Sequence, residues 1–310
     1  METAVRNEPT QTGFVSDRAT WTESILPLVL LLCFVIASAV GLYALSYLRT
    51  TLVSERGREL AMNAGGVADT LDRLMFERFG DIQLFANDAL LQAGSRSEKT
   101  ARLQQYKQLY WYYSWLGVAD ENGQMIAATD GLPAEGPSGL NPESFELVRR
   151  TGAVHFEDMR PSSESQRKMA VGFTAPIYDS KGEFRGVVVT RVPFENLRTV
   201  FEQEGRLRYR DIAYDWLLLD REGTVLSEKA RPAGINGDPV NLELPSQAQT
   251  IATRDQPGFI EEVHQRRGVA VVTGYAWTRG YANFRGFDWL VLFRLDHDQV
   301  HGSWGASGMT

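Results

Sequence analysis

The chain has 310 residues, of which 43% are hydrophobic and 23% charged, a composition typical of a globular protein. Its net charge of -7 argues against nucleic-acid binding, which requires a basic surface. The one cysteine, Cys33, excludes an intramolecular disulfide and a cysteine metal cluster.

A single long apolar run, Ile25 to Ala44, contains no charged residue. As a helix rising about 1.5 Å per residue it would span roughly 30 Å, the hydrocarbon thickness of a bilayer. Two other interpretations are a signal peptide cleaved near Ala37-Ser38-Ala39 and a buried core helix. We favour an uncut anchor, because the preceding segment is long and acidic for a signal peptide. The flanking charges carry little weight for orientation, because large domains are translocated largely regardless of them.

The anchor divides the N-terminal part of the chain into three predicted segments. Residues 1–24 are polar and predicted to form a disordered cytoplasmic tail, and residues 25–46 form the transmembrane helix. Residues 47–99 are predicted to form a long stalk helix, because apolar residues recur there at helical steps of three and four. Gly65-Gly66 would mark a kink or a boundary within it.

The following residues have the pattern of two β-hairpins separated by a helix. The sequence predicts strands at Tyr110–Asp120 and Gln124–Thr129, a helix at Pro142–Arg150 capped by Asn141, strands at Met169–Ile177 and Phe184–Val192, and a helix at Phe194–Arg208.

The hairpin pattern then starts again. Asp120 and Gly123 recur as Asp220 and Gly223, each preceded by a tryptophan, Trp115 or Trp216. Ala170-Val171 and Phe184-Arg185-Gly186 recur one hundred residues later as Ala270-Val271 and Phe284-Arg285-Gly286. The sequence therefore predicts an α+β fold with two copies of one antiparallel-sheet module.

Two motifs carry a resemblance to a known family. They are the Asp-x-x-Gly hairpin and the segment Pro176–Val187, which reads Pro-Ile-x-Asp-x-x-Gly-x-x-x-Gly-Val; the ending Gly280–Leu292 adds a Gly-x-x-Trp-x-Val pattern. With the anchor and the long helix, the chain resembles a double Cache domain, the PAS-like extracytoplasmic sensor of bacterial chemoreceptors, histidine kinases and diguanylate cyclases. The resemblance implies a membrane-distal module at residues 100–195 and a membrane-proximal module at 196–296.

The C-terminal segment departs from this family. Members usually cross the membrane again and continue into an output domain, whereas residues 297–310 are predicted to be a disordered tail. The resemblance leaves two interpretations, a truncated receptor or a stand-alone sensor that signals through a partner.

Ligand binding in the family implies a site in the distal module. The Arg-x-Trp-Tyr motif of amino-acid sensors is absent from the sequence between Thr129 and Met169, and Arg191 stands where they carry an aspartate. Because arginine binds carboxylates in a bidentate manner, we expect an anionic ligand with Arg160 and Arg191 as its charge partners. The alternative is that these arginines lie on the surface or pair with Asp158.

The aromatic residues Trp111, Tyr113 and Trp115 would share one face of a strand, by its period of two. With Phe173 they would form the wall of an apolar pocket or, alternatively, part of the core against the long helix. The sequence contains no phosphate loop, nucleophile elbow or His-Glu-x-x-His motif, so we expect no enzyme and no cofactor. His297 and His301 have the spacing of metal ligands. Because they lie in the predicted tail, we expect solvated side chains there and not a metal site.

Together these features predict a single-pass protein of the cell membrane whose periplasmic or extracellular body senses a small ligand, an organic acid being favoured. The expected partners are this ligand, the membrane and, by resemblance, a second copy joined through the stalk helix. The competing hypothesis is a protein-interaction module whose pockets are filled by its own side chains.

Overall fold

The computed structural model describes residues 18–130, 139–161, 169–208, 214–229, 240–241, 246–265 and 267–301. Most of the predicted terminal tails and the middle of the predicted loop before Asn141 lie outside these residues. The chain divides into two units, residues 1–52 and residues 53–310, and each is described by itself.

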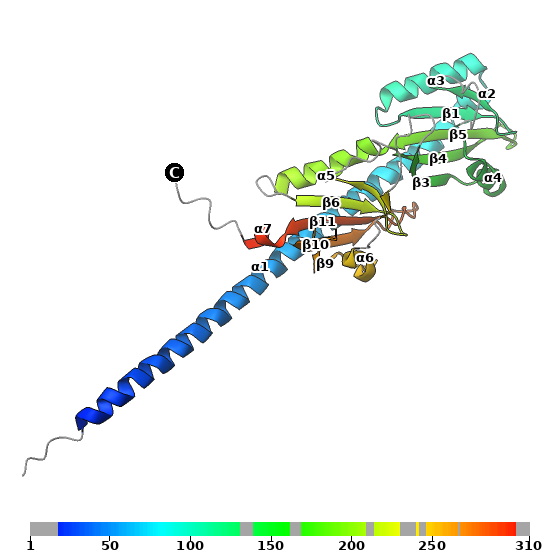
Figure 1. Cartoon of the computed structure of the whole chain (residues 1–310). Coiled ribbons are helices and arrows are strands. Elements are labelled where there is room, and N and C mark those ends of the chain that lie inside the picture. The colour runs from blue at the N-terminus through cyan, green and yellow to red at the C-terminus, as the bar shows by residue number, and fades with distance from the viewer. Residues whose placement is uncertain are drawn as a thin grey trace, which may run out of the picture. The chain divides into compact units, whose positions relative to one another are not determined.

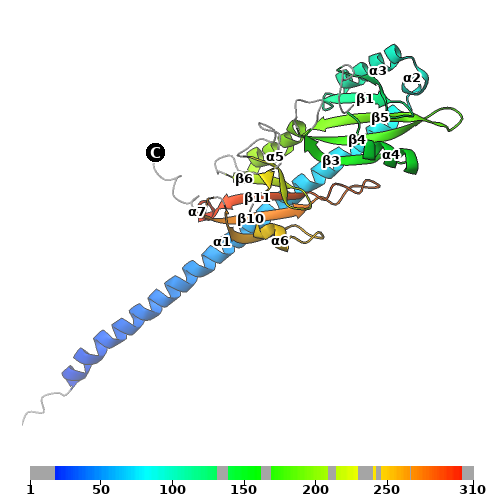
Figure 2. The same cartoon turned by 45° about the vertical axis from the view of Figure 1, so that its right-hand side comes forward.

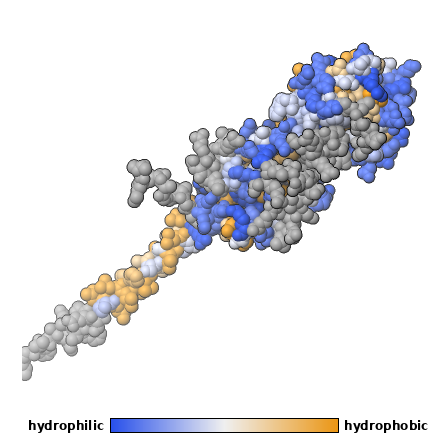
Figure 3. Space-filling model, turned by 45° about the horizontal axis from the view of Figure 1, so that its top comes forward, coloured by the Kyte–Doolittle hydropathy of each residue, from blue (hydrophilic) through white to orange (hydrophobic). Residues whose placement is uncertain are grey.

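The first unit contains the beginning of helix α1, Arg18–Ala86. Its apolar side chains are exposed, among them Leu28, Phe34 and Leu42, each more than 60% accessible. Figure 3 shows this part of α1 as a mostly hydrophobic surface. α1 is the one helix among the described residues with the length and composition to cross a membrane.

In the second unit, the remainder of α1 buries one side in the core. Leu60, Val67, Leu71, Ile82 and Phe85 are at most 1% exposed, which confirms the apolar stripe of the predicted stalk. The helix runs without a break through Gly65-Gly66 and ends at Ala86. Two short helices follow it, α2 (Ala89–Ala93) and α3 (Arg96–Leu109), and both are capped by side chains.

The first of the two modules, called the distal module below after the expectation from the sequence, is built on a five-stranded antiparallel sheet of order β2-β1-β5-β4-β3. Figures 1 and 2 show this sheet together with helix α4, Pro142–Thr151, which has the predicted cap at Asn141 and ends at Gly152. The strands are β1 (Trp115–Ala119), β2 (Met125–Ala128), β3 (His155–Pro161), β4 (Met169–Tyr178) and β5 (Phe184–Pro193).

Helix α5, Phe194–Arg208, leads into the proximal module, as predicted. Its sheet has the order β8-β7-β6-β11-β10-β9, which repeats the first sheet and adds β8 at the edge. The elements are β6 (Tyr214–Leu219), β7 (Thr224–Glu228), β8 (Val240–Asn241), α6 (Gln247–Ile251), β9 (Gly258–Val263), β10 (Ala270–Trp277), β11 (Leu290–Asp296) and α7 (His297–His301).

The Asp-x-x-Gly turns confirm the predicted repeat. In each module the amide of the turn glycine donates to the carbonyl of the aspartate, at 3.0 Å for Gly123 and 3.1 Å for Gly223. Both glycines have positive φ, 78° and 88°, a conformation that other residues adopt only with strain. The turn motif is therefore local hairpin chemistry that recurs in both modules.

The strand registers correct the rest of the predicted repeat. Val187 pairs with Ala119, and Leu290 pairs with the equivalent Leu219. Val187 is thus equivalent to Leu290, and Phe184-Arg185-Gly186 corresponds to residues 287–289 and not to Phe284-Arg285-Gly286. The Phe-Arg-Gly match at one hundred residues is therefore a coincidence, because the proximal module has a longer connection between its last two strands.

The predicted C-terminal tail is also partly wrong. Residues His297–His301 form α7, and Val300 is 4% exposed in the core. His297 lies beside Glu261, with Nε2 and Oε2 3.2 Å apart. These five residues therefore belong to the proximal module.

Candidate functional site

The two faces of the distal sheet have different coverings. Leu116, Val171, Phe173 and Val188 belong to the core cluster that contains α1. Trp115, Val187 and Val189 lie on the other face, where they pack with Phe145 and Val148 of α4. The candidate site lies on the α4 face.

One cross-strand row on the α4 face contains two opposite charges. Trp115 of β1 pairs with Arg191 of β5, Arg191 pairs with Gly172 of β4, and Gly172 pairs with Glu157 of β3. Because neighbours in antiparallel strands point to the same side, their side chains share this face. The sheet thus places Arg191 and Glu157 on either side of a glycine.

Arg191 and Glu157 form a buried ion pair. Their Nη1 and Oε2 atoms are 3.2 Å apart, and the two residues are each 6% exposed. Arg191 Nη2 donates to the carbonyl of Gly139 at 2.8 Å, and Ser144 Oγ of α4 donates to Glu157. Burying either charge alone would be costly, so the pair and its hydrogen bonds stabilise each other.

Gly172 is required beneath this pair. A Cβ atom at this position would contact Arg191 Nη1 and lie 2.9 Å from Glu157 Oε2. Because Gly172 has no side chain, the Arg191 guanidinium lies directly over β4 and reaches Glu157. The arrangement can therefore present a positive and a negative group to one ligand.

Of the six predicted site residues whose side chains the structure describes, two, Trp115 and Arg191, lie on this face. The expectation that Trp111, Tyr113 and Trp115 share one strand face is wrong, because β1 begins at Trp115. Trp111 is 71% exposed, and Tyr113 is buried on the α1 side. Phe173 also faces α1, so these aromatic residues do not form one pocket wall.

Tyr113 is held on the α1 side by a hydrogen bond. Its hydroxyl donates to Asp81 Oδ2 at 2.9 Å, and burial raises the pKa of Tyr113 so that it remains a donor. Arg78 binds the same carboxylate at 2.9 Å, and its guanidinium lies 3.5 Å from the ring centroid of Tyr112. The aromatic segment after α3 is thus attached to α1.

Asp158, another of the predicted charges, does not join Arg191. Asp158 accepts a hydrogen bond from Trp289 Nε1 at 2.7 Å, and Trp289 belongs to the proximal module. Arg160 lies in β3 opposite Ala170, and its side chain is outside the described part of the chain. The predicted alternative of an internal ion pair holds for Arg191, but its partner is Glu157 and not Asp158.

Sequence reasoning missed Glu157, Ser144 and Gly172. Glu157 could have been found if β3 had been recognised as a strand. The strand period of two places the Glu157 side chain on the opposite face of the sheet from Phe156 and Asp158. Ser144 and Gly172 have no comparable local signal, since their roles arise from tertiary contacts with Glu157 and Arg191.

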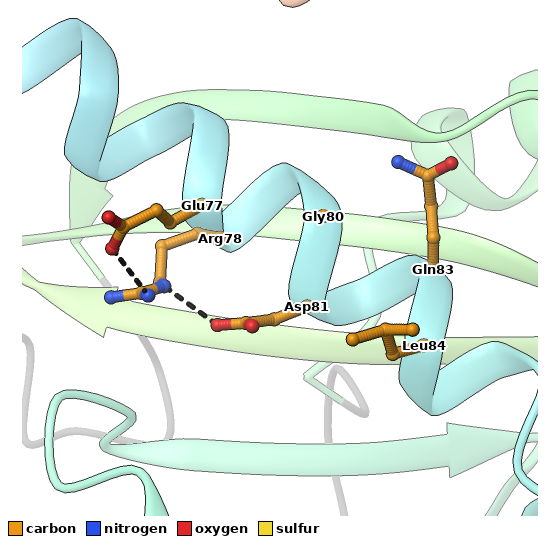
Figure 4. Close-up of a pocket in the computed structure, with 6 residues that line it drawn as sticks. All are labelled: Glu77, Arg78, Gly80, Asp81, Gln83 and Leu84. Carbon is orange, nitrogen blue, oxygen red and sulfur yellow. Dashed lines mark hydrogen bonds and ion pairs between the residues drawn. The ribbon is translucent and has the colours of Figure 1, made fainter.

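Two surface hollows lie away from this face. One, of about 540 Å³, is lined only by α1 residues, Glu77 to Leu84, and Figure 4 shows Arg78 between the carboxylates of Glu77 and Asp81. The other, of about 350 Å³, lies between β3 and the loop before β11 and includes Asp158, Arg285 and Asp288. Among the described residues, no group of three His, Cys, Asp or Glu side chains could hold a metal ion.

The duplicated PAS-like sheets, each packed on one long helix, define a two-module sensor fold. A family model of the Cache domain matches residues 48–304, so the chain belongs to the Cache family, here in its double form. Cache domains are sensor modules and not enzymes. The curated proteins contain no match.

Solved chemoreceptor domains have a similar fold. The ligand-binding domain of Pseudomonas fluorescens CtaA, solved with L-serine, is 13% identical with a TM-score of 0.55 over 79% of this chain and 98% of its own. The Campylobacter jejuni Tlp3 domain, solved with L-valine, has 11% identity and a TM-score of 0.55 over 82% and 97%. The Pseudomonas aeruginosa PctB domain, solved with L-Gln, has 16% identity and a TM-score of 0.54 over 80% and 94%.

Proposed function

We propose that this protein is a membrane-anchored extracytoplasmic sensor whose distal module binds a small ligand carrying a carboxylate. The observation that supports the proposal is Arg191, a buried arginine on the α4 face of a Cache sheet. The ligand carboxylate would replace one of the present hydrogen-bond partners of Arg191, because a guanidinium can bind a carboxylate through two parallel hydrogen bonds. The apolar, exposed start of α1 supports anchoring through residues 25–46 in the cell membrane.

Glu157 favours a second ligand class, a zwitterion. A simple anion placed beside Arg191 would also lie near the Glu157 carboxylate, 3.2 Å from the guanidinium, and would be repelled by it. An amino acid would satisfy both charges, with its carboxylate on Arg191 and its ammonium on Glu157. The similar CtaA, Tlp3 and PctB domains were solved with L-serine, L-valine and L-Gln.

The output would be a change in the position of α1. A ligand that binds one arrangement of the distal module better than another shifts the population towards it. Residues 53–86 of α1 pack against both modules, so a change in the distal core would reach this helix. An exposed side of α1, with Met62, Arg73 and Glu77, supports the proposal of a homodimer through this helix.

A thermal-shift screen of the full chain in nanodiscs tests the proposal. The panel contains organic acids, free amino acids and amines without a carboxylate. A ligand at one hundred times its dissociation constant stabilises the fold by about 2.7 kcal/mol, which raises the melting temperature by several degrees. Stabilisation by organic acids alone supports the anion, and stabilisation by amino acids alone supports the zwitterion. No stabilisation by either class contradicts the sensor and favours the protein-interaction module.

A further inference from the structure

The proximal module contains a second version of the candidate site. Arg294 of β11 pairs with Asp215 of β6 as Arg191 pairs with Trp115, so the two arginines are equivalent in strand register. Arg294 Nη2 lies 3.4 Å from Glu262 Oε1, and both residues are 6% exposed. Ser246, beside the start of α6, donates to Glu262 at 2.9 Å, as Ser144 of α4 donates to Glu157.

The two glutamates reach their arginines from different positions. Glu157 lies directly across from Gly172, whereas Glu262 lies across from Val271, two residues from the equivalent Thr273. Serine, glutamate and arginine nevertheless form the same buried contact in each module. The cluster in the proximal module can therefore be compared directly with the candidate site in the distal module.

The proximal version is filled by the side chains of the module itself. Thr273 pairs with Arg294 as Gly172 pairs with Arg191, so threonine stands where the distal module has glycine. The Thr273 hydroxyl donates to Glu262 Oε1 at 2.6 Å. The amide of Gln247 also donates to this carboxylate, at 2.8 Å.

The next position on the same face follows the same trend. Thr174 of the distal module corresponds to Tyr275, whose ring is buried in the cluster under α6. Thr174 is smaller, and its buried hydroxyl has no hydrogen-bond partner within the described part of the chain. The distal row thus has less side-chain volume where the proximal row has more.

We propose that Gly172 determines which module accepts a ligand, because a glycine at this position lets the Arg191 guanidinium lie over β4, where it can exchange its contact with Glu157 for the charged groups of a ligand. In the proximal module the Thr273 hydroxyl occupies this place and satisfies the glutamate permanently. This inference rests on the proposed function and adds to it a residue that distinguishes a ligand-accepting module from a closed one.

The test is Gly172→Thr in the full chain, with Thr273→Gly as the matched exchange in the other module. Binding of L-serine, L-valine and L-glutamine is measured separately by isothermal titration in nanodiscs. We expect Gly172→Thr to weaken binding at least tenfold without loss of the folded state, because the atoms that the new side chain meets are the ends of the Arg191 and Glu157 side chains, which can move. We expect Thr273→Gly to change affinity less than twofold while lowering the melting temperature, since Glu262 loses a donor.

The outcomes distinguish a failure of the Gly172 inference from a failure of the proposed sensor function. Unchanged binding by Gly172→Thr, when the unaltered chain binds, overturns the inference and leaves the sensor intact. An unaltered chain that binds none of the three amino acids contradicts the zwitterion proposal and, with it, the inference. Should Gly172→Thr fail to fold, Gly172→Ser decides, because it adds a smaller side chain with the same hydroxyl; tenfold weaker binding supports the inference and equal binding overturns it.

Discussion

Arg191 and Glu157 show how a buried charge constrains substitution at the scale of a residue. We predict that Arg191→Ala destabilises the protein by about 3–5 kcal/mol, because Glu157 remains buried without its partner. The double variant Arg191→Met with Glu157→Gln removes both charges and should lose less stability than the single variant. Ligand binding should be lost in both variants. Urea unfolding and titration of the same samples measure the two effects.

A surface arginine provides the control for this prediction. Arg185 binds Asp179 at 2.8 Å in an exposed turn, so Arg185→Ala should leave stability and binding almost unchanged. A double variant as unstable as Arg191→Ala would show that packing, and not the unpaired charge, accounts for the loss.

Asp72 gives a prediction about pH. Burial raises the pKa of this α1 carboxyl above its ordinary value of 3.8, although the amides of Arg279 and Gly280 oppose the shift. The folded state therefore binds the proton more tightly than the unfolded chain, and the stabilisation is lost as pH rises through the folded pKa. We expect Asp72→Asn to gain free energy of unfolding relative to the unaltered chain as pH rises from below 3.8 through the raised pKa of Asp72. Glu121→Gln, in the exposed turn between β1 and β2, serves as the control. A difference between Asp72→Asn and the unaltered chain that is flat with pH would contradict the assignment.

At the scale of elements, β3 connects the candidate site to the proximal module. Glu157 faces Arg191, while Asp158, its neighbour in the strand, binds Trp289. Phe156 contacts Phe284 and Phe287 of the loop before β11, with ring centroids 4.9 and 5.0 Å apart. A movement of β3 at the candidate site would therefore change its contacts with the proximal module.

A double-mutant cycle tests this connection. We predict a coupling energy of about 1 kcal/mol between Asp158→Ala and Trp289→Phe, because each removes one partner of the same hydrogen bond. Trp277, which donates to the carbonyl of Ala252 at 3.2 Å, is the matched control. Trp277→Phe should be additive with Asp158→Ala; additivity in both pairs would mean that the bond between modules contributes nothing.

The elements also show which parts of the fold could be predicted from the sequence. Helix α4 and the hairpin of β4 and β5 were predicted because caps, turn residues and apolar periodicity are local signals. Tyr110–Ser114 resembled a strand by composition, but its aromatic side chains bind α1 and α3 from a turn. β3 was missed because its charged residues are explained only by distant partners. The site depends on β3, so most of it could not be assembled without the structure.

At the scale of the whole molecule, Cys33 is a native reporter of membrane insertion. We predict that a membrane-impermeant maleimide does not label it in intact cells, because the residue lies within the apolar run. After detergent and denaturant it should be labelled fully. In a Cys33→Ser background, Lys181→Cys places a thiol in an exposed turn of the distal module. Labelling of this thiol from outside supports an extracytoplasmic body, whereas labelling only after lysis contradicts it.

The Asp-x-x-Gly turns have a consequence for how the chain folds. Hairpins β1–β2, β4–β5 and β6–β7 join neighbouring segments, and all three turns carry the same hydrogen bond between glycine and aspartate. The central pairings β1–β5 and β6–β11 instead join distant segments, whose loop closure costs more entropy. Pulsed hydrogen exchange during refolding should therefore protect the hairpin amides before those of the central pairings, and each sheet would be completed by the docking of preformed hairpins.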